Sequence, residues 1–99
     1  MGLALDIGSL IVSTPEVRHG RPRIAGTGIT VHRIARWHNL GLAPEEIVAK
    51  YGHLTLAQVH AALAYCHANR SQIDSDLAAE EAEEENILDR HRRGLTDDA

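Results

Sequence analysis

Arginine side chains give this sequence its clearest chemical capacity, because a guanidinium group binds phosphate oxygens with a fixed charge and a planar set of donors. Three arginines stand in a stretch rich in Gly and Pro, and two more follow shortly afterwards. With Lys50 they form a set of cations suited to a polyanion: Arg18, Arg21, Arg23, Arg33 and Arg36. The stretch 18–36 contains no Phe, Tyr or Trp, which disfavours base stacking on a single strand. An ordinary solvated surface is the alternative.

A second group of hydrogen-bonding side chains begins at Thr55. Gln58 can pair with an adenine edge, and Thr55 can contact a phosphate or a base, if the start of a helix enters a major groove. His60 is the third candidate of this group. The alternative is structural, because Thr55 with Gln58 three residues later is also a capping box that starts a helix. A glutamine held in a cap is less free to contact a base.

Other kinds of site have little support. The sequence has seven histidines, of which His60 and His67 are seven residues apart beside Cys66. Cys66 is expected in the core, so a metal site is not expected. The glycines from 20 to 28 lack the P-loop pattern, and no nucleophile, base and acid can be assigned together. We therefore expect no cofactor and no enzyme activity.

Three helices are expected to position the two groups of side chains. Thr30 can cap a helix from residue 31 to about 40, with Arg33 and Arg36 on its polar side. A second helix starts with Pro at 44, carries Glu45 and Glu46 in its first turn and stops before Gly52. The third follows the Thr55 cap to at least residue 69. A short helix, a tight turn and a well-capped helix are typical of a helix-turn-helix.

The apolar spacing predicts which faces of these helices are buried. The first helix is expected to bury one apolar side. The second helix is expected to bury the side chains of Ile47 and Val48. On the third helix, a 3-4-3 stripe is expected in the core, with Ala61 and His60 on other faces. The expected members of the two stripes are Val31, Ile34, Ala35, Trp37 and Leu40, and then Leu56, Val59, Leu63 and Cys66.

A short β element is expected before the helices. Residues 10–13 are apolar and β-branched, and they end at Thr14-Pro15. Residues 23–24 and 29–30 are expected as two very short strands, joined by a turn over 25–28. Such strands are not stable alone, so they must pair with residues 10–13 or with a second chain.

The charge is unevenly distributed along the 99 residues, although the formal net charge is only −4. Residues 1–70 carry seven Lys or Arg and four acids, whereas residues 71–99 carry ten acids and three arginines. This asymmetry favours a domain at 1–70 with an acidic extension at 71–99, each with its own partner. A single cysteine and the lack of a long apolar run favour a cytoplasmic protein that does not span a membrane.

Three segments resemble those of one known family. They are GRPRIAGT at 20–27 with Val31, LGLAPEEI at 40–47, and a third set made of Tyr51, Leu54-Thr55, Val59, Ala62-Leu63 and Tyr65. They resemble the GxPxIxGT, LxxGxSxEEI and YPxLTxxxVxxALxY segments of the DUF433 family, over about residues 10–67. The resemblance implies a small helix-turn-helix module, homeodomain-like or winged, that dimerises through its N-terminal strands.

The resemblance also implies a function. Many such proteins are VapB-like antitoxins beside a toxin with a PIN-like nuclease fold. We therefore expect a homodimeric repressor that binds double-stranded DNA at its own operator, with an extension that is helical or partly disordered until it binds the toxin. The expected toxin-binding residues are Ile73, Leu77, Glu81, Glu84, Ile87 and Leu88. The alternative is a dimeric protein-interaction adaptor without DNA binding, which a neutral or apolar surface at 55–61 would favour.

Overall fold

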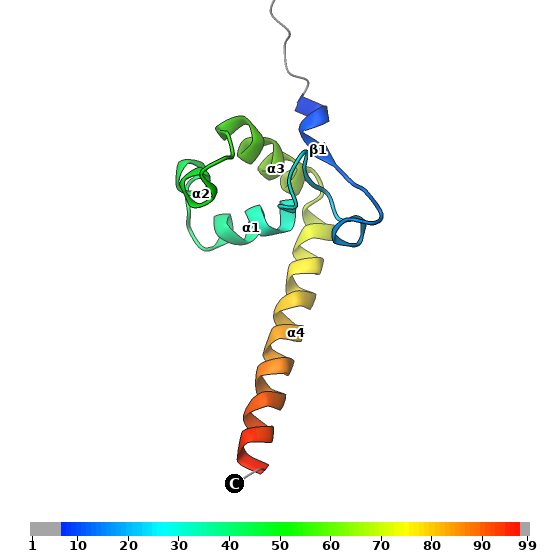
Figure 1. Cartoon of the computed structure of the whole chain (residues 1–99), viewed down its shortest axis with the longest axis vertical. Helices are drawn as coiled ribbons and strands as arrows, with labels where there is room; N and C mark the ends of the chain where they lie inside the picture. Colours follow the sequence, from blue (N-terminus) through cyan, green and yellow to red (C-terminus); the bar gives the residue numbers. More distant parts are fainter. Residues whose placement is uncertain (1–6, 98–99) are drawn as a thin grey trace, which may run out of the picture. The chain divides into compact units, whose positions relative to one another are not determined.

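Four α-helices and two short strands make up residues 7–97, the part of the chain that this computed structural model describes (Figure 1). The protein is therefore mainly helical, with a small antiparallel sheet before the helices, as the sequence predicts. The chain divides into two compact units, Met1–Asn69 and Arg70–Ala99.

The first three helices start where the sequence predicts, α1 and α3 after a capping Thr and α2 with Pro44 at its first position. Helix α1 (Val31–Asn39) follows Thr30, whose hydroxyl oxygen accepts from the Arg33 N–H at 3.2 Å. Helix α2 (Pro44–Tyr51) follows Ala43, which has no side-chain acceptor, so only the reverse half of a capping box forms: the Ala43 N–H donates to Glu46 Oε1 at 2.8 Å.

Helix α3 (Leu56–Ala68) has the complete capping box that the sequence predicts. The Thr55 N–H donates to Gln58 Oε1 at 2.7 Å, and the Gln58 N–H donates to Thr55 Oγ1 at 3.2 Å. Before it, α2 ends at Gly52, whose φ of +73° lies in the left-handed region that glycine adopts without strain. Four residues, Gly52 to Thr55, therefore connect α2 to α3.

The strands pair within the chain. Strand β1 (Ile11–Val12) is antiparallel to β2 (Arg23–Ile24), with Ile11 opposite Ile24. The second predicted strand, at 29–30, is shorter than expected, because Thr30 makes only an isolated bridge to Arg23. Short 3-10 helices precede each strand, at Ile7–Leu10 and at Arg18–Gly20.

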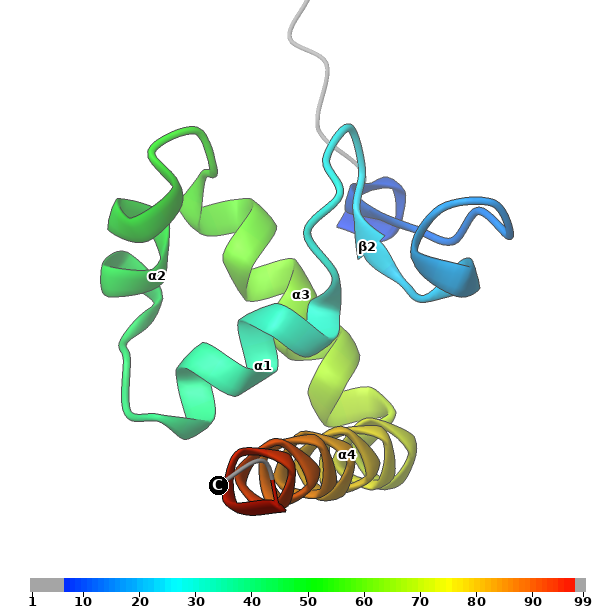
Figure 2. The ribbon, with the colours of Figure 1, turned by 60° about the horizontal axis from the view of Figure 1, so that its bottom comes forward.

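The core of the first unit is aliphatic and is built around α3. Helices α1 and α2 and strand β2 all pack against α3, and Figure 2 shows α2 and the strand-bearing segment on opposite sides of α1 and α3. The largest completely buried side chains are Ile24, Val31, Ile34, Ile47 and Val59. The Cys66 thiol donates to the Val31 carbonyl oxygen at 3.4 Å, which joins the C-terminal half of α3 to the start of α1.

Three burial predictions are wrong. Leu56 was expected in the core, but it is 44% exposed, because Leu54 just before the cap is buried in its place. Ala61 was expected on another face, but it is buried, since α3 contacts α1, α2, β2 and the 3-10 helix at Ile7–Leu10, so its buried face is wider than one stripe. Leu40 was expected on the apolar side of α1, but it lies beyond the last helical residue and is 71% exposed.

The second unit is a single helix, α4 (Arg70–Asp97). The expectation that the third helix continues past residue 69 is wrong, because Asn69 has φ −124° and ψ 38° and ends α3. The new helix extends to Asp97, so the acidic extension is helical over its described residues. Ile73 and Leu77 are buried, whereas Ile87 and Leu88 are 53% and 57% exposed.

Candidate functional site

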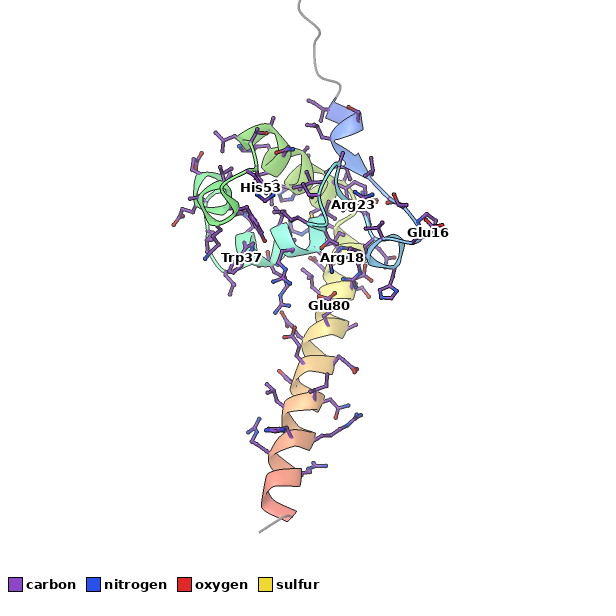
Figure 3. The ribbon with its side chains drawn as sticks, viewed as in Figure 1. Glu16, Arg18, Arg23, Trp37, His53 and Glu80 are labelled. Carbon is purple, nitrogen blue, oxygen red and sulfur yellow. The ribbon has the colours of Figure 1, made fainter. Side chains whose placement is uncertain are left out.

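Two of the predicted phosphate-binding arginines donate to the protein itself. Arg23 donates from Nη1 to the Thr27 carbonyl oxygen at 3.0 Å and from Nη2 to Thr14 Oγ1 at 2.9 Å. Arg18 donates from Nε to the Gly28 carbonyl oxygen at 3.1 Å. Arg23 is half-buried and Arg18 is exposed. These contacts join the loop after β1, which contains Thr14 and Arg18, to the segment from β2 to the loop before α1. Figure 3 labels both arginines.

The other three arginines differ in exposure. Arg33 is exposed on α1, and Arg21 and Arg36 are half-buried. The Pro22 carbonyl oxygen accepts from the Val31 N–H at 3.0 Å, so the segment that carries Arg21 lies at the start of α1. Of the five predicted arginines, Arg33 therefore combines an exposed position on α1 with a guanidinium group that makes no hydrogen bond to the other residues that the structure describes.

The start of α3 presents few groups that can read a base. Thr55 and His60 are exposed, but Thr55 Oγ1 and Gln58 Oε1 accept the two capping hydrogen bonds. The other exposed residues of this part of the helix are Leu56 and Ala57. Residues 43–69 carry only Glu45, Glu46 and Lys50 as charged side chains. The surface around the predicted recognition helix is therefore close to neutral, with acids in the first turn of α2.

The two predicted groups of DNA-binding residues lie at different ends of α3. Thr55 precedes the helix, whereas Cys66, eleven residues later, contacts Val31 at the start of α1. Eleven helical residues span about 16 Å. The segment with Arg18, Arg21 and Arg23 joins that same start of α1. The structure therefore brings the arginines of this segment together but does not bring them to Thr55.

An aromatic contact joins α1 to α2 close to the turn before α3, and it was not predicted. Trp37 Nε1 donates to the Tyr51 hydroxyl oxygen at 2.8 Å, and Lys50 Nζ lies 4.4 Å from the centroid of the Trp37 ring. His53 packs edge-on to Tyr51, with ring centroids 6.4 Å apart. Its Nδ1 lies 2.8 Å from the Tyr51 carbonyl oxygen, so Nδ1 is the donor. Figure 3 labels Trp37 and His53 on this side of the unit.

The predicted toxin-binding residues divide into two sets. Ile73 and Leu77 are buried. Glu81, Glu84, Ile87 and Leu88 are exposed on the distal part of α4. From residue 71 to residue 89 the helix carries eight acids and no Lys or Arg, and Arg90, Arg92 and Arg93 follow directly.

Over residues 7–97 no helix is both long enough and apolar enough to cross a membrane. In that same part of the chain, no group of three or more His, Cys, Asp or Glu side chains could hold a metal ion.

The first unit is thus a mainly helical module in which three helices follow a two-stranded antiparallel sheet. The family model described as "Protein of unknown function (DUF433)" matches residues 11–66, and the chain belongs to the DUF433 family. A crystal structure of a DUF433 member protein from Anabaena variabilis is similar, with 34% sequence identity and a TM-score of 0.67. The match covers 71% of this chain and 69% of that chain. No curated protein matches this chain.

Proposed function

We propose that this chain is the antitoxin of a type II toxin–antitoxin pair and that it represses its own operon. In this proposal, α2 and α3 are a helix-turn-helix that binds operator DNA, and α4 binds a toxin with a PIN-like nuclease fold. A homodimer would place two copies of α3 in major grooves about 34 Å apart on a palindromic site.

The observation that carries the proposal is the connection of α2 to α3. Four residues join the two helices, and both caps of the connection are well formed: Gly52 ends α2 and the Thr55–Gln58 box starts α3. The first residues of α3 are exposed, as is required of a helix that enters a groove. Because the exposed side chains here are few and short, we assign to α3 a role in fitting the groove and to Arg33 a phosphate contact.

The toxin contact is assigned to the exposed residues of α4. Ile87 and Leu88 supply apolar area, and Glu81 and Glu84 supply negative charge that suits the basic cleft of a nuclease. The test is coexpression of the chain with the product of the neighbouring reading frame, which this proposal requires to be a nuclease-like toxin. Neutralisation of the toxin should be lost in I87S/L88S and retained in A82S, on another side of α4. Full neutralisation by I87S/L88S would refute the assignment.

One observation favours a second function, that of a dimeric protein-interaction adaptor. The surface at 55–61 is neutral, since its exposed members are Thr55, Leu56, Ala57 and His60. Phosphate-binding surfaces carry Lys or Arg, and α3 carries neither. A mobility shift with the DNA upstream of the chain's own reading frame, at two salt concentrations, separates the two functions. If no shift is seen at low salt, the chain does not bind this DNA, and the adaptor function is favoured.

A further inference from the structure

The distal part of α4 has an exposed apolar centre with opposite charges on its two sides. Ile87 and Leu88 are 53% and 57% exposed, although large aliphatic side chains are normally buried. Glu84, Ile87, Leu88 and His91 follow the spacing i, i+3, i+4, i+7, so they share one face of the helix. We call these four residues the distal stripe.

The charges around the distal stripe are nearly antisymmetric about its centre. On the N-terminal side, Glu83 and Glu85 flank the stripe, and on the C-terminal side Arg90 and Arg92 flank it at the mirrored positions. Each acid is as far from the midpoint between Ile87 and Leu88 as one of the arginines. A helix with this pattern is complementary to itself when it is turned end to end.

We propose that the distal stripe binds the same stripe of a second copy of this chain, with the two α4 helices antiparallel. A two-fold axis between Ile87 and Leu88 places the apolar residues of both copies at the centre of the contact, as isologous pairing requires. It places Glu83 beside Arg90 of the second copy and Glu85 beside Arg92 of the second copy. Pairs of this kind set the orientation of paired helices.

The charge pattern selects the antiparallel arrangement over the parallel one. In a parallel pair, each acidic turn would face the acidic turn of the other copy, and each arginine would face an arginine. Like charges at such positions repel, and this repulsion excludes wrong arrangements. The antiparallel arrangement converts the same side chains into attractive contacts.

The helix is formed in the single chain, which lowers the entropic cost of pairing. Acids predominate in its N-terminal half and arginines follow near its C-terminal end, as the helix dipole favours. Asp89 and Arg93, which form an ion pair at 2.8 Å, lie on the side of α4 away from the distal stripe and are not part of the contact.

This pairing does not depend on the proposed DNA binding. It does bear on toxin binding, because Ile87 and Leu88 would serve both contacts. The second copy and the toxin would then compete for the distal stripe, so the free antitoxin would be a dimer through α4 and the toxin would displace the second copy.

Charge reversal on the full-length chain tests the pairing, without DNA or toxin, by sedimentation velocity over a range of concentrations. The unchanged chain should dimerise. E83R/E85R alone and R90E/R92E alone should each weaken the dimer about tenfold or more, because all flanking contacts become repulsive. An equimolar mixture of the two variants should form a dimer again, since each contact then joins Arg to Glu. Circular dichroism of each variant should show the same helix content as the unchanged chain.

The matched control is D89R/R93D, which exchanges two charges on the other side of the helix at constant net charge and should leave the dimer unchanged. A monomeric unchanged chain would overturn the proposal. So would dimers of unchanged strength in both reversed variants, a mixture that stays monomeric, or an equal loss in the control.

Discussion

Trp37 of α1 donates a 2.8 Å hydrogen bond from its indole Nε1 to the hydroxyl oxygen of Tyr51, the last residue of α2. Both side chains are half-buried, and Lys50 lies over the indole ring with its Nζ 4.4 Å from the centroid. This contact holds the C-terminal ends of α1 and α2 together directly before the turn into α3. The orientation of α2 therefore depends on a polar contact as well as on the buried Ile47.

We expect Y51F to lower the free energy of unfolding by about 1 kcal/mol, because it leaves the half-buried indole N–H without its acceptor. W37F should cost a similar amount and also weaken the attraction of Lys50 to the ring. The double variant should cost less than the sum of the two, since both remove one hydrogen bond. Urea unfolding of the four proteins measures this, and strictly additive losses would show that the bond contributes nothing.

Arg23 is expected to act on stability more than on DNA affinity. R23A removes the hydrogen bonds to Thr27 and Thr14 and should lower the free energy of unfolding by about 1–3 kcal/mol. R33A, at an exposed position, should change it by less than about 0.5 kcal/mol. Thermal or urea unfolding distinguishes them. If R23A is as stable as the unchanged chain and loses DNA affinity, the guanidinium group binds phosphate after all.

Two variants of the Thr55 cap distinguish a structural role of Thr55 from a contact with a base. T55A should destabilise the chain by about 1 kcal/mol, while T55D keeps a capping acceptor and should remain close to the unchanged stability. T55D nevertheless adds a negative charge where α3 would approach DNA, so its DNA affinity should fall. Equal DNA binding by T55D and the unchanged chain would place the start of α3 away from the nucleic acid.

The sequence alone predicts the helices well, because their ends depend on local signals. Thr30, Pro44, Gly52 and the Thr55–Gln58 box each act on residues within one helical turn, and each helix begins or ends where they predict. The need of residues 23–24 for a neighbouring strand also follows from the sequence, but the choice of residues 11–12 over a second chain does not.

The side-chain contacts are harder to predict, because they depend on which elements meet. An arginine donates equally well to a phosphate and to a carbonyl oxygen, so the sequence does not distinguish the two uses of Arg23. Alanine carries a weak apolar signal, and the burial of Ala61 follows only once α3 is known to contact α1, α2 and β2. The break at Asn69 has no Gly or Pro to mark it.

The proposed function depends on whether the first unit binds DNA at all, and the salt dependence of binding measures this most directly. Fluorescence anisotropy is recorded with labelled duplex from upstream of the reading frame and with an unrelated duplex of equal length. We predict tighter binding to the upstream duplex and weaker binding as salt rises. R33A should lower the affinity for both duplexes about equally and reduce the salt slope by about one. No binding at low salt, or binding that salt does not weaken, would contradict the helix-turn-helix assignment.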